Sequence, residues 1–229
     1  MTMPLEPLRS TDALGESARC GIQKQWPLKS KIDDSLHWDY IQKVNYAVQD
    51  FNASIADKES LDRESVVFAI TLVDWINDAV ERILNCYRDD TVDSFVYSRQ
   101  SELDGTRKYF KAVRSFVNAH PLGTDRHRVF GLDGNYVCID IRSKSRMLGL
   151  VSTDLYMLTP GGLEQVDDLR EADVVLYAYS KTDGGMFYHH VGLDLDDVCQ
   201  VAHLCIDKLY ELDKHLGHIK KKDYPAKES

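Results

Sequence analysis

The sequence predicts an α+β protein, a four-helix bundle with an antiparallel β segment inserted between the third and fourth helices. Apolar residues recur every three or four positions through the first half of the chain and again near its C-terminal end, as in amphipathic helices. Between about residues 128 and 193 the apolar period changes to two, and glycine-rich turns separate the runs. Because an amphipathic helix cannot bury its apolar face alone, we expect the four helices to pack together.

The helices follow from these apolar stripes and from the residues that stop them. The first is predicted within 37–55 and the second within 61–86, with Ser60 as its N-cap. The third is predicted over 96–119 and ends before Pro121, because proline cannot continue a helix. The fourth begins at Leu195 and runs to about 216. The stripes are expected to be buried, and nine of their members are Val44, Val48, Val73, Ile76, Val80, Val113, Ala202, Cys205 and Leu209.

The β segment is predicted from alternation and from turn residues. Residues 129–132 and 136–141 flank an Asp-Gly-Asn turn and predict a hairpin. A weaker strand is predicted over 150–158. Residues 173–179 and 186–193 predict a second hairpin around a turn that contains two adjacent glycines.

The same patterns divide the chain along its length. Residues 1–36 carry scattered prolines and charges and predict an irregular N-terminal arm. The bundle domain is expected over 37–218, with its β insertion at about 128–193. Residues 219–229 predict a polar tail.

Composition excludes several classes of protein. The chain has 229 residues, of which 43% are hydrophobic, so it has enough apolar surface for a folded core. No apolar run reaches the roughly 20 residues that a membrane-spanning helix needs, and the acidic N-terminus is unlike a secretory signal. The net charge of −9 disfavours a protein that coats duplex DNA. Five widely spaced cysteines without a C-x-x-C pair favour free thiols in a reducing compartment, so a cytoplasmic location is expected.

Motifs for cofactors and metals are missing from the sequence. There is no glycine-rich phosphate loop and no H-E-x-x-H zinc motif, so no cofactor is expected. His189 and His190 are adjacent on a predicted strand and should face opposite sides of it. His215 and His218, with Asp213, make at most a weak surface site. We therefore expect no metal site.

Candidate catalytic residues gather where the third helix ends. Arg114 offers a planar fork of donors that suits phosphate oxygens, and His120 can move a proton near neutral pH. Ser115 and Asn118 lie between them and could orient them. Together Arg114 and His120 could cleave RNA without a metal, through attack of the 2′-hydroxyl on the neighbouring phosphate. Six helical residues turn by about 600°, so the pair converges only if the last turn loosens or if a second subunit contributes.

At these residues the chain resembles the HEPN family (higher eukaryotes and prokaryotes nucleotide-binding). The hallmark of that family is an arginine, four to six further residues and a histidine, on a helical bundle. Arg114-x5-His120 fits the spacing, whereas the residue after the arginine, often Asn, Asp or His in active members, is Ser115 here. The resemblance implies a metal-independent endoribonuclease of a defence, toxin–antitoxin or RNA-processing system. It also implies a site built across a homodimer, and an antitoxin or regulator protein as a possible partner.

A second interpretation remains open, in which the bundle is a dimerisation or partner-binding module without catalysis. Arg114 is then an ordinary charge on a helix surface. His120 then serves as a cation at a helix C-terminus, where the helix dipole favours positive charge.

Overall fold

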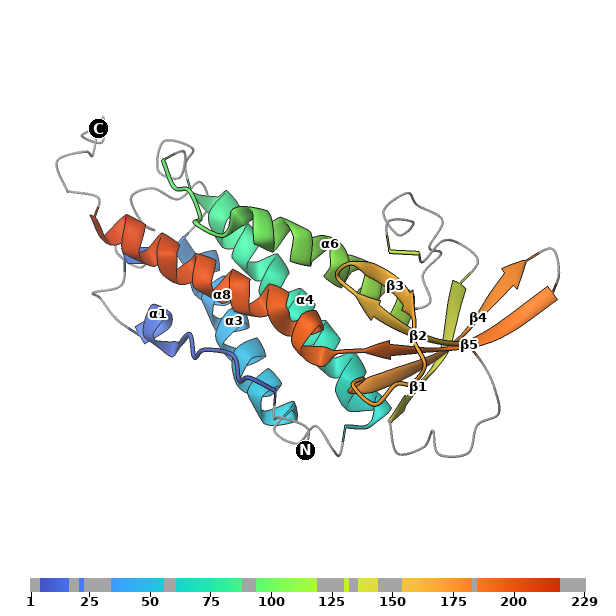
Figure 1. Cartoon of the computed structure of the whole chain (residues 1–229). Helices are drawn as coiled ribbons and strands as arrows, with labels where there is room; N and C mark the ends of the chain where they lie inside the picture. Colours follow the sequence, from blue (N-terminus) through green and yellow to red (C-terminus); the bar gives the residue numbers. More distant parts are fainter. Residues whose placement is uncertain are drawn as a thin grey trace, which may run out of the picture. The chain divides into compact units, whose positions relative to one another are not determined.

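The structure is a computed structural model and belongs to the α+β class, as predicted. It describes residues 5–16, 21–22, 34–55, 61–87, 94–118, 130–131, 136–143, 154–182 and 185–218. In chain order the elements are α1 (Asp12–Glu16), α3 (Asp34–Ser54), α4 (Arg63–Cys86), α6 (Gln100–Val117), β1 (Tyr136–Ser143), β2 (Asp154–Thr159), β3 (Gly162–Gln165), β4 (Val174–Thr182), β5 (Gly185–Leu193) and α8 (Leu195–His218). Figure 1 labels them along the chain.

The order of the described elements departs from the predicted one. The short helix α1 lies in the segment expected to be an irregular arm, so the strands follow the fourth described helix and not the third. The spacing of apolar residues does not predict helix α1, because its 5 residues span little more than one turn. The four-helix bundle with a β insertion therefore stays a prediction.

The chain forms two compact units. Unit 1 is drawn from Met1–Pro7, Ala53–Thr71 and Ser101–Val201, and unit 2 from Leu8–Asn52, Leu72–Gln100 and Ala202–Ser229. Helices α4 and α8 each contribute one part to each unit. The boundaries expected near residues 36 and 218 stay predictions.

Unit 1 holds a five-stranded sheet in the order β1-β4-β5-β2-β3. Strands β4 and β5 form the predicted hairpin, with Val174 opposite Leu193 at one end and Thr182 opposite Gly185 at the other. The sheet is not wholly antiparallel as expected, because β2 pairs in parallel with β5. Alternation of apolar residues is the same for both strand directions, so the sequence pattern could not reveal this pairing.

The first predicted hairpin is also wrong in the described part of the chain. Strand β1 pairs with β4, and Tyr136 lies opposite Ser180. Of its expected partner strand, 129–132, the structure describes Phe130 and Gly131, and both lie in a turn. The positive φ of Gly131, 72°, suits glycine at that turn.

The two faces of the sheet carry different side chains. Ala178 lies opposite His189, and Tyr177 lies opposite His190, so the two histidines face opposite sides of β5 as predicted. On the Tyr177 side, a small apolar cluster forms around Leu169, Ala172 and Val175.

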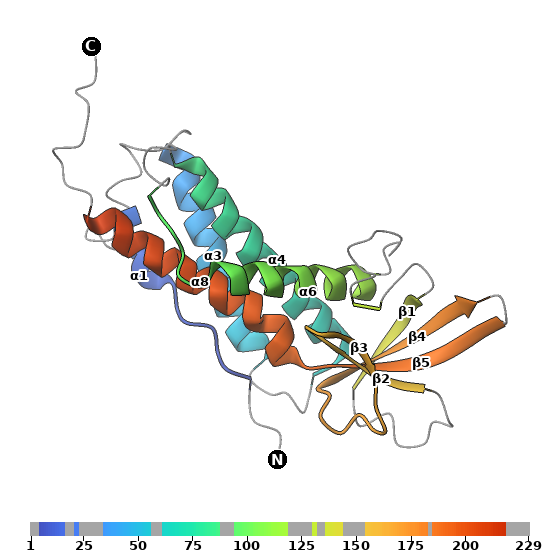
Figure 2. The same ribbon diagram turned by 45° about the horizontal axis from the view of Figure 1, so that its top comes forward.

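Unit 2 combines α1 and most of α3 with parts of α4 and α8, and Figure 2 shows α1 beside α3 and α8 from a second angle. The backbone of Leu8 makes two hydrogen bonds of 2.8 Å with the side chain of Asn52. The Thr11 hydroxyl donates to Asn45 Oδ1 at 2.6 Å, in a buried position. These contacts fasten the segment before α1 onto α3.

Burial confirms the predicted apolar stripes. All nine residues named from the sequence are 2% exposed or less, eight of them in unit 2 and Val113 in unit 1. Across the described helices, none combines the length and the hydropathy that crossing a membrane requires.

Candidate functional site

Arg114 lies in the last turn of α6, where the structure places two of the predicted site residues on one face. The Asn118 N–H donates to the Arg114 carbonyl oxygen at 3.0 Å, so the helical hydrogen bonding continues to residue 118. Residues four positions apart are rotated by about 40° around a helix, so Arg114 and Asn118 are neighbours on its surface. Arg114 is partly buried and Asn118 is exposed.

The rest of the predicted set is distributed differently. Ser115 is partly buried and lies about 100° around the helix from Arg114. Phe116, which is 1% exposed, anchors the opposite side of α6 in the interior. His120 lies outside the described residues, so its pairing with Arg114 stays a prediction.

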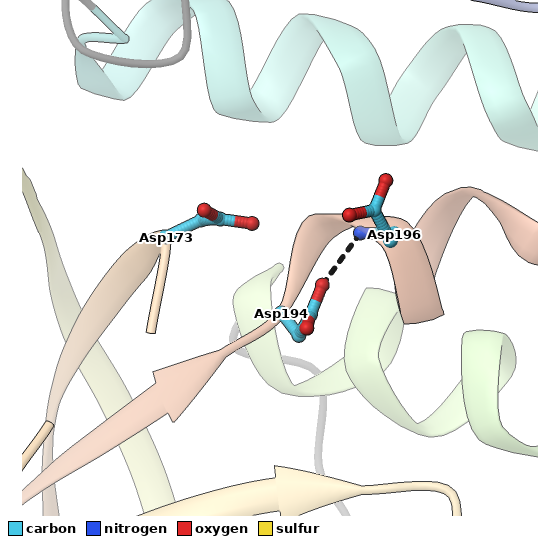
Figure 3. A group of neighbouring side chains, drawn as sticks. All are labelled: Asp173, Asp194 and Asp196. Carbon is cyan, nitrogen blue, oxygen red and sulfur yellow. Dashed lines mark hydrogen bonds between the residues drawn. The ribbon is translucent and has the colours of Figure 1, made fainter. Parts of the chain in front are cut away.

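A second group of polar side chains joins the start of β4 to the start of α8. Asp173, Asp194 and Asp196 each offer a carboxylate oxygen, and these atoms all lie within 4.8 Å of one another (Figure 3). No local sequence pattern indicates this group, because its members come from two turns that only the fold brings together.

Local hydrogen bonds explain much of this acidic group. Asp173 Oδ2 accepts from the Leu195 N–H at 3.0 Å, and Asp194 Oδ1 accepts from the Asp196 N–H at 2.8 Å. Both carboxylates therefore satisfy donors at the N-terminus of α8, where negative charge is favoured. Burial, with Asp194 and Asp196 nearby, raises the pKa of the neighbouring Asp197.

A third group, here called the His189 cluster, lies on the sheet and consists of Ser180 on β4, His189 on β5 and Asp154 on β2. The Ser180 Oγ and His189 Nε2 atoms are 2.7 Å apart in a buried hydrogen bond. Asp154 Oδ2 lies 4.0 Å from His189 Nδ1. A hydroxyl, an imidazole and a carboxylate thus follow one another across three adjacent strands.

Burial and aromatic contacts determine the surroundings of this imidazole, and burial determines its protonation state. Ser180 is 6% exposed and His189 is 4% exposed. The rings of Tyr136 and Tyr156 lie with their centroids 5.3 Å and 5.4 Å from that of His189. Burial lowers the pKa of His189 below its ordinary value of 6.5, and the carboxylate of Asp154 opposes this effect. The imidazole is therefore neutral at pH 7, the state in which one ring nitrogen accepts a proton.

Sequence reasoning placed His189 correctly but missed its partners. Ser180 and Asp154 are ordinary strand residues, and no local spacing connects them to His189. The signal that could have found them is strand register. His189 lies opposite both Ala178 and Asp154, which sets Ser180 diagonally across on the same face.

The described cysteines are poor candidates for a nucleophile. Cys86, Cys138, Cys199 and Cys205 are free thiols and are buried. Burial raises the pKa of Cys138 to about 11 and also raises that of Cys86, so neither is a thiolate at neutral pH.

Comparisons of the chain with protein-family models, with curated proteins and with solved structures gave no match.

Proposed function

We propose that this protein is a HEPN-like, metal-independent endoribonuclease, or an RNA-handling protein of the same type, in a cytoplasmic defence, toxin or stress system. The observation that carries the proposal is the shared face of Arg114 and Asn118 at the C-terminal end of α6. There the arginine can hold a phosphate and the amide can hold a ribose, with Asn118 two residues and Arg114 six residues before the histidine of the motif. The proposed architecture is a four-helix bundle with the β segment as an insertion.

Each residue has a distinct role in this proposal. Arg114 binds the scissile phosphate with two parallel N–H donors and stabilises the charge that develops on its oxygens. His120 serves as the general acid and base that moves the proton of the 2′-hydroxyl. Ser115 and Asn118 are positioning residues.

The assembly that we propose is a homodimer, in which two copies of the motif form one cleft. A regular helix turns Arg114 and His120 about 120° apart, so a second subunit supplies the simplest way to bring an arginine to a histidine. An antitoxin or regulator protein that covers this cleft would control the activity.

The direct test is cleavage of a mixed-sequence RNA by the full chain in EDTA. We expect the wild-type protein to cut, and Arg114→Ala and His120→Ala to lose most of the activity. Lys111→Ala is the matched control, because Lys111 is an exposed cation one turn earlier on α6. Equal cleavage by all four proteins, or none by the wild type, would reject the proposal.

A second candidate function is a non-catalytic dimerisation or partner-binding module. It is favoured by exposed aromatic side chains on unit 2, namely Tyr46 at 61% and Trp75 at 44% exposure. The ammonium of Lys43 lies 5.1 Å from the Trp75 ring centroid, a cation–π arrangement that leaves part of the ring open. If RNA is not cut, loss of the dimer in Trp75→Glu, measured by light scattering, would support this module.

A further inference from the structure

The His189 cluster is separate from the Arg114 motif and has the order of groups found in serine nucleophile sites. Ser180 Oγ contacts His189 Nε2 at 2.7 Å, within the range of a strong hydrogen bond. The other ring nitrogen, Nδ1, is buried and makes no hydrogen bond with the residues that the structure describes, and Asp154 Oδ2 lies 4.0 Å from it. Such sites are recognised by geometry and roles and not by chain order.

The position of Asp154 determines which ring nitrogen carries the proton. A proton on Nδ1 faces the carboxylate, whereas a lone pair there would face a negative charge. The favoured neutral tautomer is therefore Nδ1–H, which leaves Nε2 as an acceptor. The Ser180 hydroxyl then donates to Nε2, as a nucleophile does toward its general base.

The imidazole is also held in place. Tyr136 on β1 and Tyr156 on β2 contact His189 from two different strands. Its backbone is fixed between β4 and β2 by the ladder. A base whose orientation is set by packing is preorganised for proton transfer.

Solvent reaches the edge of the cluster from two sides. The side chain of Asp154 is 56% exposed. Phe187, the cross-strand partner of Ser180, is 48% exposed. Because Ser180 itself is 6% exposed, the cluster suits a small electrophile and not a polymer chain.

We infer that Ser180 is an activated nucleophile that takes small acyl groups from esters, with His189 as its general base and Asp154 as the group that orients the imidazole. Ser180 Oγ bonds to the ester carbonyl carbon, and its proton moves to His189 Nε2. The bond from that carbon to the leaving oxygen breaks, and the leaving oxygen takes the proton. Water then attacks the acyl-serine, gives a proton to Nε2, and releases the carboxylic acid as that proton returns to Ser180.

The test uses the full chain with a fluorophosphonate probe, which forms a bond from Ser180 Oγ to phosphorus as fluoride leaves. Peptide mapping by mass spectrometry should place the adduct on Ser180, and Ser180→Ala should abolish it. His189→Gln should lower the labelling rate by about 10²–10⁴-fold, the range for loss of a positioned base. Ser101→Ala is the matched control, since Ser101 is exposed on α6 and should not change the labelling.

A further variant, Asp154→Asn, should fold normally, because Asp154 lies largely in solvent at the edge of the cluster. A loss of activity in this variant therefore cannot be caused by unfolding. This variant should keep the wild-type circular dichroism spectrum. It should lower labelling and the hydrolysis of 4-nitrophenyl acetate by about 10²-fold or more, because the favoured tautomer is lost. Folded wild-type protein whose Ser180 stays unlabelled, or labelling that is equal in His189→Gln, would overturn the inference.

The outcome is distinguishable from that of the proposed ribonuclease. Arg114→Ala should leave labelling of Ser180 unchanged, and Ser180→Ala should leave RNA cleavage unchanged. If Arg114→Ala or Ser180→Ala lost both the labelling and the RNA cleavage, the inference that the two sites act separately would be wrong.

Discussion

The hydroxyl of Tyr109 donates a hydrogen bond to the carbonyl oxygen of Leu158 at 2.9 Å and so fastens α6 to β2 within unit 1. Tyr109 is fully buried, and the ring of Phe130 meets it edge-on at 6.1 Å between centroids. Burial raises the pKa of the Tyr109 hydroxyl, with Asp197 and Asp194 adding to the effect, so this hydroxyl stays a donor at any physiological pH. The contact connects the helix that carries Arg114 with the sheet that carries the His189 cluster.

Tyr109→Phe removes this hydrogen bond and leaves the ring packing intact. We expect the free energy of unfolding to fall by about 0.5–1.5 kcal/mol, the usual net value of one hydrogen bond. Urea denaturation measures it. Tyr46→Phe is the matched control, because Tyr46 is 61% exposed and should change stability little.

Asn52→Ala should loosen the segment that precedes α1. The Asn52 side chain makes two hydrogen bonds with the backbone of Leu8, so its loss leaves a backbone donor and acceptor without that partner. We expect a cost of about 1–3 kcal/mol, together with faster proteolysis near Leu8. Asn85→Ala, at an exposed position near the end of α4, is the control. Equal proteolysis of the two variants would show that this contact does not hold the segment.

The Lys208–Glu81 pair in unit 2 should respond asymmetrically to substitution. Lys208 is 8% exposed, and its ammonium lies 3.4 Å from Glu81 Oε1. Glu81→Gln leaves a largely buried cation without a carboxylate, and we expect a loss of about 1–3 kcal/mol. Lys208→Met keeps the apolar stem and removes the buried charge, so it should cost less. Thermal denaturation of both variants measures the two losses of stability. A greater loss in Lys208→Met than in Glu81→Gln would contradict this account.

Local patterns were sufficient to predict the main helices and the β4–β5 hairpin. The stripe from Val44 to Val48 and the buried apolar run from Val174 to Leu176 depend on neighbours within a few residues, which the sequence displays directly. The parallel pairing of β2 with β5 is different, because it depends on which strands meet after the chain has folded. No period in the sequence encodes that choice.

The candidate sites differ in the same way. The sequence indicates Arg114 and His120 because they are close in sequence, as short motifs must be. Ser180, His189 and Asp154 are brought together by strand register and by a parallel pair, so their proximity follows from the tertiary fold alone. Sequence reading therefore finds motifs on one element more readily than constellations spread over three.

His189 should make stability depend on pH. Its pKa in the folded chain is lowered from 6.5 by burial, so the unfolded chain binds the proton more readily. The stability is then fully present above about pH 6.5 and falls as the pH decreases below that value, until the pH passes the lowered pKa. Denaturation of wild type and His189→Gln at several values between about pH 4 and pH 8 measures the difference between their free energies of unfolding. A wild-type stability that rises relative to the variant on acidification would mean that the folded state binds the proton more tightly.

The ribonuclease proposal makes its sharpest prediction about the substrate. Because the attacking oxygen is the 2′-hydroxyl of the RNA, cleavage should leave a 2′,3′-cyclic phosphate, and a 2′-deoxy nucleotide at the scissile position should block it. Arg114→Lys should lose most activity even though the charge is kept, since an ammonium cannot make two parallel bonds to a phosphate. His120→Ala should lower the rate by about 10²–10⁴-fold. Gel analysis of end-labelled RNA with a single deoxy position measures all three. Cleavage of the deoxy substrate, or activity that disappears in EDTA, would assign the reaction to a different chemistry.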